Sequence, residues 1–146
     1  MGDQSIILLV EDNPDDVELI EYAFGKAGIT NPLAVVTNGD AAVSYVEGVG
    51  AYADRRLHPL PSLFLLDLKL PKRSGFEVLG RIRATEATRR TPVVVLTSSN
   101  QEPDIRQAYD LGANSYLVKP VGHDALLAMV CSLEAYWLKL NQTAAA

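Results

Sequence analysis

The sequence predicts an α/β protein in which helices cover both faces of a doubly wound, five-stranded parallel sheet. Five short apolar runs recur along the chain, and each is continuous rather than alternating. A strand covered on both faces has no solvent-facing side, so continuous apolar runs are typical of parallel sheets. Helical start and stop signals lie between the runs, and this alternation favours right-handed crossovers. The expected strands are residues 5–10, 33–37, 62–67, 92–97 and 114–118.

Size and composition indicate one globular domain. The chain has 146 residues, of which 48% are hydrophobic and 21% charged, and such a chain can build a single core. We expect one domain over residues 1–146, with its core at about 5–140 and a flexible tail at 141–146. No apolar stretch reaches the roughly 20 residues that cross a bilayer, and no targeting signal is found. A cytoplasmic protein without membrane contact is expected.

Charge and cysteine content argue against several other classes. The net charge is −5 and the isoelectric point is about 4.9, which disfavours direct binding of nucleic acid. Cys131 is the only cysteine, so an intramolecular disulfide and a cysteine-built metal cluster are excluded. A buried, unreactive thiol is expected at this position.

The first helix has clear boundaries. Asn13 is expected to cap a helix that begins at Pro14, because its side chain can accept hydrogen bonds from the first free backbone N–H groups. Asp15 and Asp16 then lie in the first turn, where negative charge is favourable. Gly28 follows the last turn and provides a stop.

Two later helices carry similar signals, and one connection is unusually long. Residues 74–77, Ser-Gly-Phe-Glu, form a capping-box pattern, and Gly112 is a stop signal after residues 104–111. Residues 48–61 exceed the usual length of a connection between helix and strand. We interpret them as a solvated extension of the second helix and a rigid entry to the third strand, with a partner contact as the alternative.

Polar residues stand where the predicted strands end. In a doubly wound sheet, the carboxyl ends of the strands open into one crevice that carries function. Three carboxylates, hydroxyl groups and an ammonium group are expected to meet there. They belong to Glu11 and Asp12, Asp67, Thr97 and Ser98, and Lys119.

The three carboxylates of Glu11, Asp12 and Asp67 predict a metal site. Carboxylates held close together repel one another unless a cation neutralises them. Mg²⁺ prefers oxygen ligands and is often held by one or two carboxylates and a phosphoryl group. The favourable position of negative charge at a helix start is enough to explain Asp15 and Asp16. It does not explain Asp67, which ends an apolar strand.

Lys119 and Thr97 suggest that the site handles phosphate. Beside an acidic metal site, Lys119 can pair with Asp67 at rest and with a phosphoryl oxygen when one is present. The Thr97 hydroxyl can donate to another phosphoryl oxygen. A solvated lysine and a threonine that only fills its strand are the alternatives.

Taken together, these motifs resemble the receiver domain of two-component response regulators, over about residues 6–140. The motifs are Glu11-Asp12-Asn13, Asp67-Leu68-Lys69-Leu70-Pro71 with Ser74-Gly75, Thr97-Ser98 and Lys119-Pro120. The resemblance implies a flavodoxin-like sheet with strand order 2-1-3-4-5. The long second crossover is also similar to small response regulators that pair with bacterial phytochrome kinases.

The resemblance implies a stand-alone phosphorelay protein rather than a turnover enzyme. Asp67 would accept a phosphoryl group from a sensor histidine kinase, catalyse its own transfer and later lose the group. Mg²⁺ would be held by Asp12, Asp67 and the backbone carbonyl of Lys69, with help from Glu11. Lys119 and Thr97 would hold phosphoryl oxygens. Without an effector segment after residue 140, output is expected through a partner, a dimer or onward transfer.

The resemblance also implies three finer features. The Lys119–Pro120 peptide bond is expected to be cis. Thr97 and Tyr116 are expected to form a switch, in which Tyr116 turns inward when Thr97 moves toward the phosphoryl group. Ser98 stands where many receivers have a small alanine, and its hydroxyl is expected to alter the phosphoryl lifetime.

The last helix predicts a homodimer through the fourth helix, fifth strand and fifth helix. On a wheel at about 100° per residue, two apolar stripes appear, and a helix in this fold needs one buried face. The first stripe, expected on the core, is Leu126, Met129, Val130, Leu133, Trp137 and Leu140; the second is Leu127, Cys131 and Leu138. The alternatives are that a wide core face absorbs part of the second stripe, or that its apolar residues are simply exposed, which needs no function.

Three other functions compete with the phosphorylated switch. A mononucleotide binder wants a glycine- or hydroxyl-rich loop after its first strand, and residues 11–14 offer carboxylates and a proline instead. An aspartyl-phosphate phosphatase usually has a second acid two residues after its nucleophile, where Lys69 stands. A receiver-like protein that is never phosphorylated would lack one of the acids, Thr97 or Lys119, and all are present.

Overall fold

The computed structural model describes residues 5–144, and these form the predicted α/β sandwich. The elements are β1 (Ile7–Val10), α1 (Pro14–Lys26), β2 (Leu33–Val36), α2 (Gly39–Glu47), η2 (Gly50–Tyr52), β3 (Leu63–Leu66), α3 (Gly75–Ala84), β4 (Val93–Thr97), α4 (Glu102–Asp110), β5 (Ser115–Val118), α5 (His123–Leu133) and η3 (Glu134–Leu140). The five strands are parallel in the order β2-β1-β3-β4-β5, which confirms the expected fold and order. Within residues 5–144, no helix has the length and apolar character of a membrane span.

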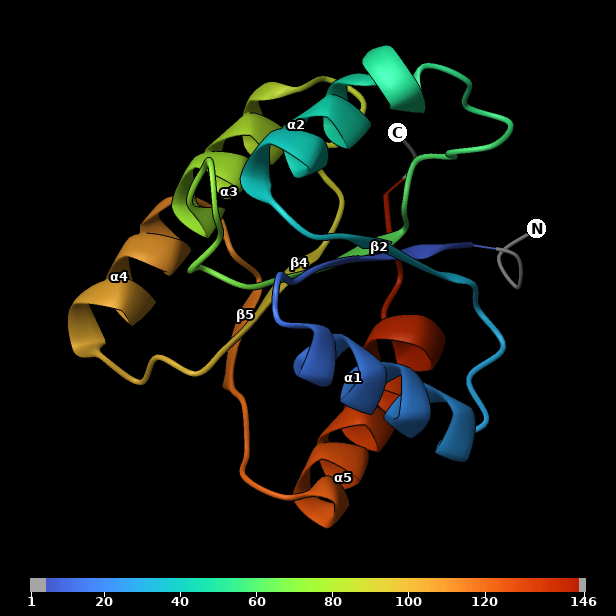
Figure 1. The fold of residues 1–146 in the computed structure, drawn as a ribbon, viewed down its shortest axis with the longest axis vertical. Helices are drawn as coiled ribbons and strands as arrows, with labels where there is room; N and C mark the ends of the chain where they lie inside the picture. The colour runs from blue at the N-terminus through green and yellow to red at the C-terminus, as the bar shows by residue number, and fades with distance from the viewer. Residues whose placement is uncertain (1–4, 145–146) are drawn as a thin grey trace.

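The sheet separates two apolar cores. Figure 1 shows α1 and α5 on one face of the sheet, with α2 and α3 on the other. Alternate residues of β1 serve the two sides: Ile7 and Leu9 pack with α1 and α5, whereas Leu8 and Val10 pack with α2 and α3. All four side chains of β1 are therefore buried, which explains why its apolar run is continuous.

The predicted helix signals are confirmed. The Asn13 side chain accepts hydrogen bonds from the backbone N–H groups of Asp15 and Asp16, at 2.9 and 3.4 Å. The Ser74–Glu77 capping box is present at the start of α3. Gly28 and Gly112 have φ angles of 73° and 105°, the left-handed region that glycine enters without steric cost.

The long connection over residues 48–61 differs from the expected extension of the second helix. It folds back onto α2, because the Arg55 guanidinium donates to the carbonyl oxygens of Tyr45 and Val46 at 2.8 and 2.9 Å. The Tyr45 hydroxyl donates to the Pro59 carbonyl at 2.9 Å. Arg55 thus caps the end of α2: it adds a second donor to the Tyr45 carbonyl, which also accepts from the Gly48 N–H, and it bonds the Val46 carbonyl in the last turn.

The two-stripe prediction for the last helix is wrong in part. Leu127 and Leu138, predicted to lie outside the core in a dimer interface, pack on the same core as Leu126, which is the alternative of a wide core face. Leu140, predicted on the core, is 72% exposed, and Cys131 is exposed rather than buried. For Leu138 and Leu140 the reason is geometric, because both lie in η3, a π-helix whose wider turn displaces its residues from a wheel drawn at about 100° per residue. Leu127 and Cys131 lie in the regular helix α5, whose core face takes in Leu127 and leaves Cys131 exposed. The single core face is correspondingly broad.

Candidate functional site

The carboxyl ends of β1 and β3 bring the predicted acids together. Val10 pairs with Leu66 at the end of the two strands, so Glu11 and Asp67 follow side by side. Carboxylate oxygens of Glu11, Asp12 and Asp67 lie within 4.8 Å of one another. Glu11 and Asp67 are buried, while Asp12 is exposed and open to an incoming ion. This all-oxygen donor set fits Mg²⁺.

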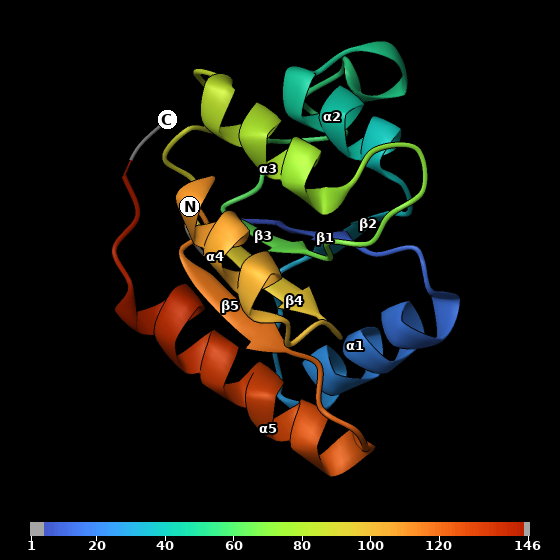
Figure 2. The ribbon, with the colours of Figure 1, turned by 90° about the vertical axis from the view of Figure 1, so that its left-hand side faces the viewer.

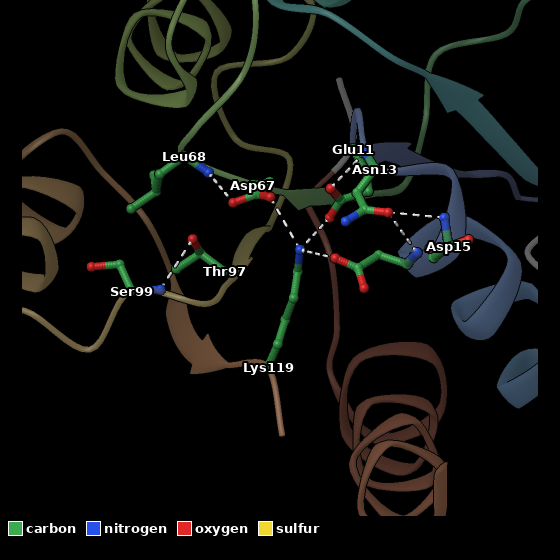
Figure 3. Close-up of polar contacts among 9 residues, drawn as sticks. Glu11, Asn13, Asp15, Asp67, Leu68, Thr97, Ser99 and Lys119 are labelled. Atoms are coloured by element: carbon green, nitrogen blue, oxygen red, sulfur yellow. Dashed lines mark hydrogen bonds and ion pairs between the residues drawn. The ribbon is translucent and has the colours of Figure 1, made fainter. Parts of the chain in front are cut away.

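Lys119 joins the acids from the end of β5. Its Nζ atom lies 2.5 Å from Glu11 Oε1 and 3.1 Å from Asp67 Oδ2, and Figure 3 shows the ammonium group between them. A third contact, 2.9 Å to Asp16 Oδ2, was not predicted. The predicted pairing of Lys119 with Asp67 is therefore present, together with two further carboxylates.

Burial and charge act in opposite directions on this cluster. Burial raises the pKa of Glu11 to about 7, although its hydrogen bond to Lys119 works against the increase. For Lys119, burial opposes the charged form, but the hydrogen bonds to Glu11 and Asp16 and the charge of Asp67 outweigh it and raise its pKa. The ammonium group is therefore held in its charged form among the carboxylates.

Thr97 and the loop after β3 complete the surroundings of Asp67. Thr97 is 1% exposed at the end of β4, and Figure 3 shows its side chain near Asp67. The second Asp67 oxygen, Oδ1, accepts a hydrogen bond from the Leu68 backbone N–H at 2.7 Å. Lys69, whose carbonyl was predicted to bind the metal, is exposed in the same loop.

Gly75 has a structural role near the site that its place in a capping motif did not reveal. A Cβ atom at this position would lie 2.1 Å from the Asp67 carbonyl oxygen, well inside van der Waals contact. Its N–H group donates to the Leu68 carbonyl at 2.8 Å. Only a glycine lets the start of α3 approach the backbone of Asp67 this closely.

Tyr116 is packed inward in this structure. Its ring lies against the core shared with α2 and α3, and its hydroxyl donates to the Ser99 carbonyl at 3.0 Å. Burial raises the pKa of the Tyr116 hydroxyl. The Ser99 hydroxyl in turn donates to Asp104 Oδ2 at 2.6 Å, which ties this turn to α4. Ser98 is exposed.

The predicted cis bond between Lys119 and Pro120 is wrong for this structure, because every peptide bond within residues 5–144 is trans. The trans form is the lower in energy for most bonds before proline. Here the Lys119 backbone N–H donates to the Thr97 carbonyl at 2.7 Å, and the side chain reaches all three acids with the trans geometry.

Sequence reasoning missed Asp16 as a residue of the site. Its place in the first turn of α1 was sufficient to explain its charge, and its contact with Lys119 spans 103 positions of the chain. The only available signal was spacing: Asp16 lies on the helix that directly follows Glu11 and Asp12.

Comparison with known proteins agrees with this geometry. Residues 7–131 match the family model described as "Response regulator receiver domain". The chain is 42% identical to the probable methanogenesis regulatory protein FilR2 of Methanothrix harundinacea, with 97% of this chain and 88% of the relative covered. It is 38% identical to response regulator Rcp1 of Synechocystis, with 95% of each covered.

Solved structures give the same picture. The Mn²⁺-bound form of Rcp1 superposes with a TM-score of 0.87 at 38% identity, over 97% of this chain and 99% of the other. The phosphorylated cyanobacterial phytochrome response regulator RcpA has a TM-score of 0.89 at 37% identity, over 96% and 98%. With the family model matching most of its length and these relatives spanning nearly all of it, the chain belongs to the response regulator receiver domain family.

Proposed function

We propose that Asp67 is the phosphoacceptor of this response regulator and takes its phosphoryl group from a phosphohistidine of a sensor histidine kinase. One observation carries the assignment. Asp67 is a buried carboxylate at the end of β3, with Lys119 3.1 Å from one oxygen and the acids Glu11 and Asp12 within 4.8 Å. This combination supplies a nucleophile, a fixed cation and an acidic metal pocket at one point.

The transfer conserves atoms and charge. An Asp67 carboxylate oxygen forms a bond to phosphorus while the bond between phosphorus and the histidine nitrogen breaks. The histidine nitrogen keeps the electron pair of that bond, and the ring leaves as neutral imidazole because it takes up one proton from solvent. Lys119 can then turn its ammonium group toward the phosphoryl oxygens, and Thr97 can donate its hydroxyl to another. Later attack by water on phosphorus returns the free carboxylate, so the protein resets itself.

Mg²⁺ is the cofactor of this acidic site, where it neutralises negative charge on the phosphoryl oxygens. We propose Asp12, Asp67 and the Lys69 carbonyl as its protein ligands, with Glu11 assisting. The chemistry of the donor set supports this, because three carboxylates supply hard oxygen atoms and no sulfur or imidazole stands among them.

The test is phosphoryl uptake from a small donor. In Mg²⁺ and acetyl phosphate, the wild-type protein is expected to gain the mass of one phosphoryl group, which is lost again on standing. In EDTA, no mass increase is expected, because the negative charges of donor and acids are then unopposed. Intact-mass spectrometry measures both. Uptake that persists in EDTA, or none in Mg²⁺, contradicts the proposal.

The proposed partner is a sensor kinase of the bacterial phytochrome type. The support is the likeness over nearly the full length to Rcp1 and to the phytochrome response regulator RcpA. The cytoplasmic location stays a prediction. The absence of nucleic-acid binding also stays a prediction, and it agrees with a net charge of −5. Membership of the receiver domain family does not favour a mononucleotide binder, an aspartyl-phosphate phosphatase or a receiver-like protein that is never phosphorylated over the phosphorylated switch.

For the switch, we propose that phosphorylation selects the inward position of Tyr116. Tyr116 already lies inward in this structure, with its hydroxyl donating to the Ser99 carbonyl. Movement of Thr97 toward a phosphoryl group would leave space beside the ring and so stabilise this inward position. A Thr97→Ala variant is expected to take up phosphoryl but to lose at least half of the Tyr116 response, since the moving hydroxyl is absent. The ¹⁹F signal of 3-fluorotyrosine at 116, assigned with Tyr116→Phe, reports the response. Thr97→Ser should restore it; an unchanged response in Thr97→Ala contradicts the coupling.

We also propose a homodimer through α4, β5 and α5, now supported by the exposed outer strand β5 rather than by a second apolar stripe on the last helix. β5 is an outer strand of the sheet, and Figure 2 shows it running between α4 and α5 at the side of the molecule. A groove of about 460 Å³ beside it is lined by Leu117, Met129 and Trp137, among others. Exposed apolar side chains on this face are Tyr109, Val118 and Tyr136. An uncovered outer strand with apolar neighbours is suited to a second copy.

Sedimentation at micromolar concentration tests the dimer. The wild-type protein with phosphodonor is expected to sediment as a dimer, and a Val118→Glu/Tyr136→Glu double variant as a monomer, because charge would be buried in the interface. Leu57→Glu is the matched control, since Leu57 is 73% exposed outside this face. A wild-type monomer with and without phosphodonor removes the proposal.

A further inference from the structure

Lys119 is shared by carboxylates of two kinds. Glu11 and Asp67 belong to the group of acids that can hold a metal ion. Asp16 does not belong to that group, although its Oδ2 atom lies 2.9 Å from Lys119 Nζ. Asp16 also comes from a different element, since it lies within α1 while the metal group follows β1 and β3.

A bound metal ion would change the balance among these three contacts. A cation held by the acids Glu11, Asp12 and Asp67 would compete with the Lys119 ammonium for the same oxygen lone pairs and would repel it. Asp16 would then remain as the carboxylate that holds the ammonium group without also serving the ion.

We propose that Asp16 is a positioning residue, which keeps Lys119 aimed at the phosphoryl position while the metal occupies Glu11, Asp12 and Asp67. The inference rests on the proposed function, since it concerns the same site and the same transfer. It adds a fourth carboxylate to the site, one that acts on the lysine rather than on the ion.

The surroundings of Asp16 suit such a role. Its backbone N–H is bonded to Asn13 Oδ1 at the helix cap, so the start of α1 fixes its position relative to Glu11. The side chain of Lys119 is 13% exposed and that of Asp16 is 34% exposed. A partly exposed ion pair of this kind contributes little to stability, and its main effect is expected on the direction of the ammonium group.

Asp15 provides a matched control. It carries the same charge, lies in the same first turn and uses the same Asn13 cap. It is exposed, and Lys119 contacts Glu11, Asp16 and Asp67 rather than Asp15. If Asp16 served only to stabilise the helix start, its replacement would have the same effect as replacement of Asp15.

The first experiment compares Asp16→Asn with Asp15→Asn. At saturating Mg²⁺, phosphorylation of Asp16→Asn by acetyl phosphate is expected to be about ten-fold slower than wild type, because a catalytic group loses its alignment. The phosphorylation rate of Asp15→Asn is expected to stay within roughly two-fold of the wild-type rate, since exposed charges interact weakly. The Mg²⁺ dissociation constants of the two variants are also expected to lie within roughly two-fold of each other. Equal rates for the two variants overturn the proposal.

A double-mutant cycle identifies Lys119 as the route. In a Lys119→Ala background, Asp16→Asn is expected to cause no further loss of rate, because the group that it positions is gone. A further loss as large as in the wild-type background shows that Asp16 acts on something other than Lys119 and overturns the proposal.

A second readout separates this inference from the proposed function. The Lys119 side-chain NMR signals of the Mg²⁺-saturated protein are expected to report an ordered ammonium group in wild type and in Asp15→Asn, and a mobile one in Asp16→Asn. If wild type takes up no phosphoryl group while this difference is present, the proposed function fails and the positioning role stands. If uptake occurs and Lys119 is equally ordered in all three proteins, the positioning role fails alone.

Discussion

An Asp67→Asn variant is expected to take up no phosphoryl group from acetyl phosphate in Mg²⁺, under conditions in which the wild-type protein gains one. The amide is a far weaker nucleophile than the carboxylate and cannot form the acyl phosphate. Intact-mass spectrometry over the time course of the wild-type reaction measures the loss.

The matched control for this variant is Asp110→Asn, an identical change at an exposed position of α4. Asp110→Asn should gain the phosphoryl group at the wild-type rate. Circular dichroism before the reaction shows whether Asp67→Asn is folded, which is expected since an amide can still accept the Leu68 hydrogen bond. A labile phosphoryl group on folded Asp67→Asn would place the acceptor elsewhere and refute the assignment.

A Lys119→Ala variant is expected to lose about 3 kcal/mol of unfolding free energy at pH 8 without metal, because removing the cation leaves buried carboxylates uncompensated. Glu11 and Asp67 are 1% and 7% exposed, so water cannot readily replace the ammonium group. Phosphoryl uptake should also fall at least about a hundred-fold, since a cation at the transferring group is lost. Urea titration and intact-mass kinetics measure the two effects.

The contribution of Glu11 to the stability of the wild-type protein depends on pH. Burial raises the pKa of Glu11 from 4.5 to about 7 in the wild-type protein, so the folded state binds this proton more tightly than the unfolded chain. The stability from that proton is complete below pH 4.5 and is lost as the pH rises through 7. Without Lys119, which lowers the pKa of Glu11, the decline should extend to higher pH.

Lys26→Ala, an exposed change at the end of α1, is the control for Lys119→Ala and should shift stability by less than about 0.5 kcal/mol. Addition of Mg²⁺ should recover part of the stability lost in Lys119→Ala, because the ion supplies the missing positive charge. If Lys119→Ala and wild type have the same unfolding free energy at pH 8 without metal, the three contacts of Lys119 contribute nothing to stability and the prediction is refuted.

Local patterns were enough to predict the architecture and most of the site. The apolar runs of β1 and β3 are buried on both faces, and a run of that kind has few other places in a globular protein. Asn13 and Ser74 cap their helices through contacts within three residues. The acids Glu11, Asp12 and Asp67 meet because parallel strands of matched register end at the same edge.

Contacts between distant parts of the chain were harder to predict. Gly75 matters because it lies against the Asp67 carbonyl, and Arg55 because it reaches back to the end of α2. Neither contact has a periodic or spaced signature. The trans bond at Lys119–Pro120 is likewise a property of the folded site. The intrinsic preference for trans before proline is small, so the surrounding tertiary contacts decide which isomer forms.

The residues alone established a five-stranded parallel sheet, an acidic magnesium pocket around Asp67 and a lysine to accompany it, because each follows from short-range patterns combined with the rule that strand ends converge. Folding in three dimensions established which carboxylates Lys119 contacts, and it added Asp16 from a helix whose charge already had a local explanation. It also established that α5 continues as a π-helix with one broad core face. Hydrogen-bond partners and helix winding depend on packing across the whole molecule, and no single stretch of sequence determines that packing.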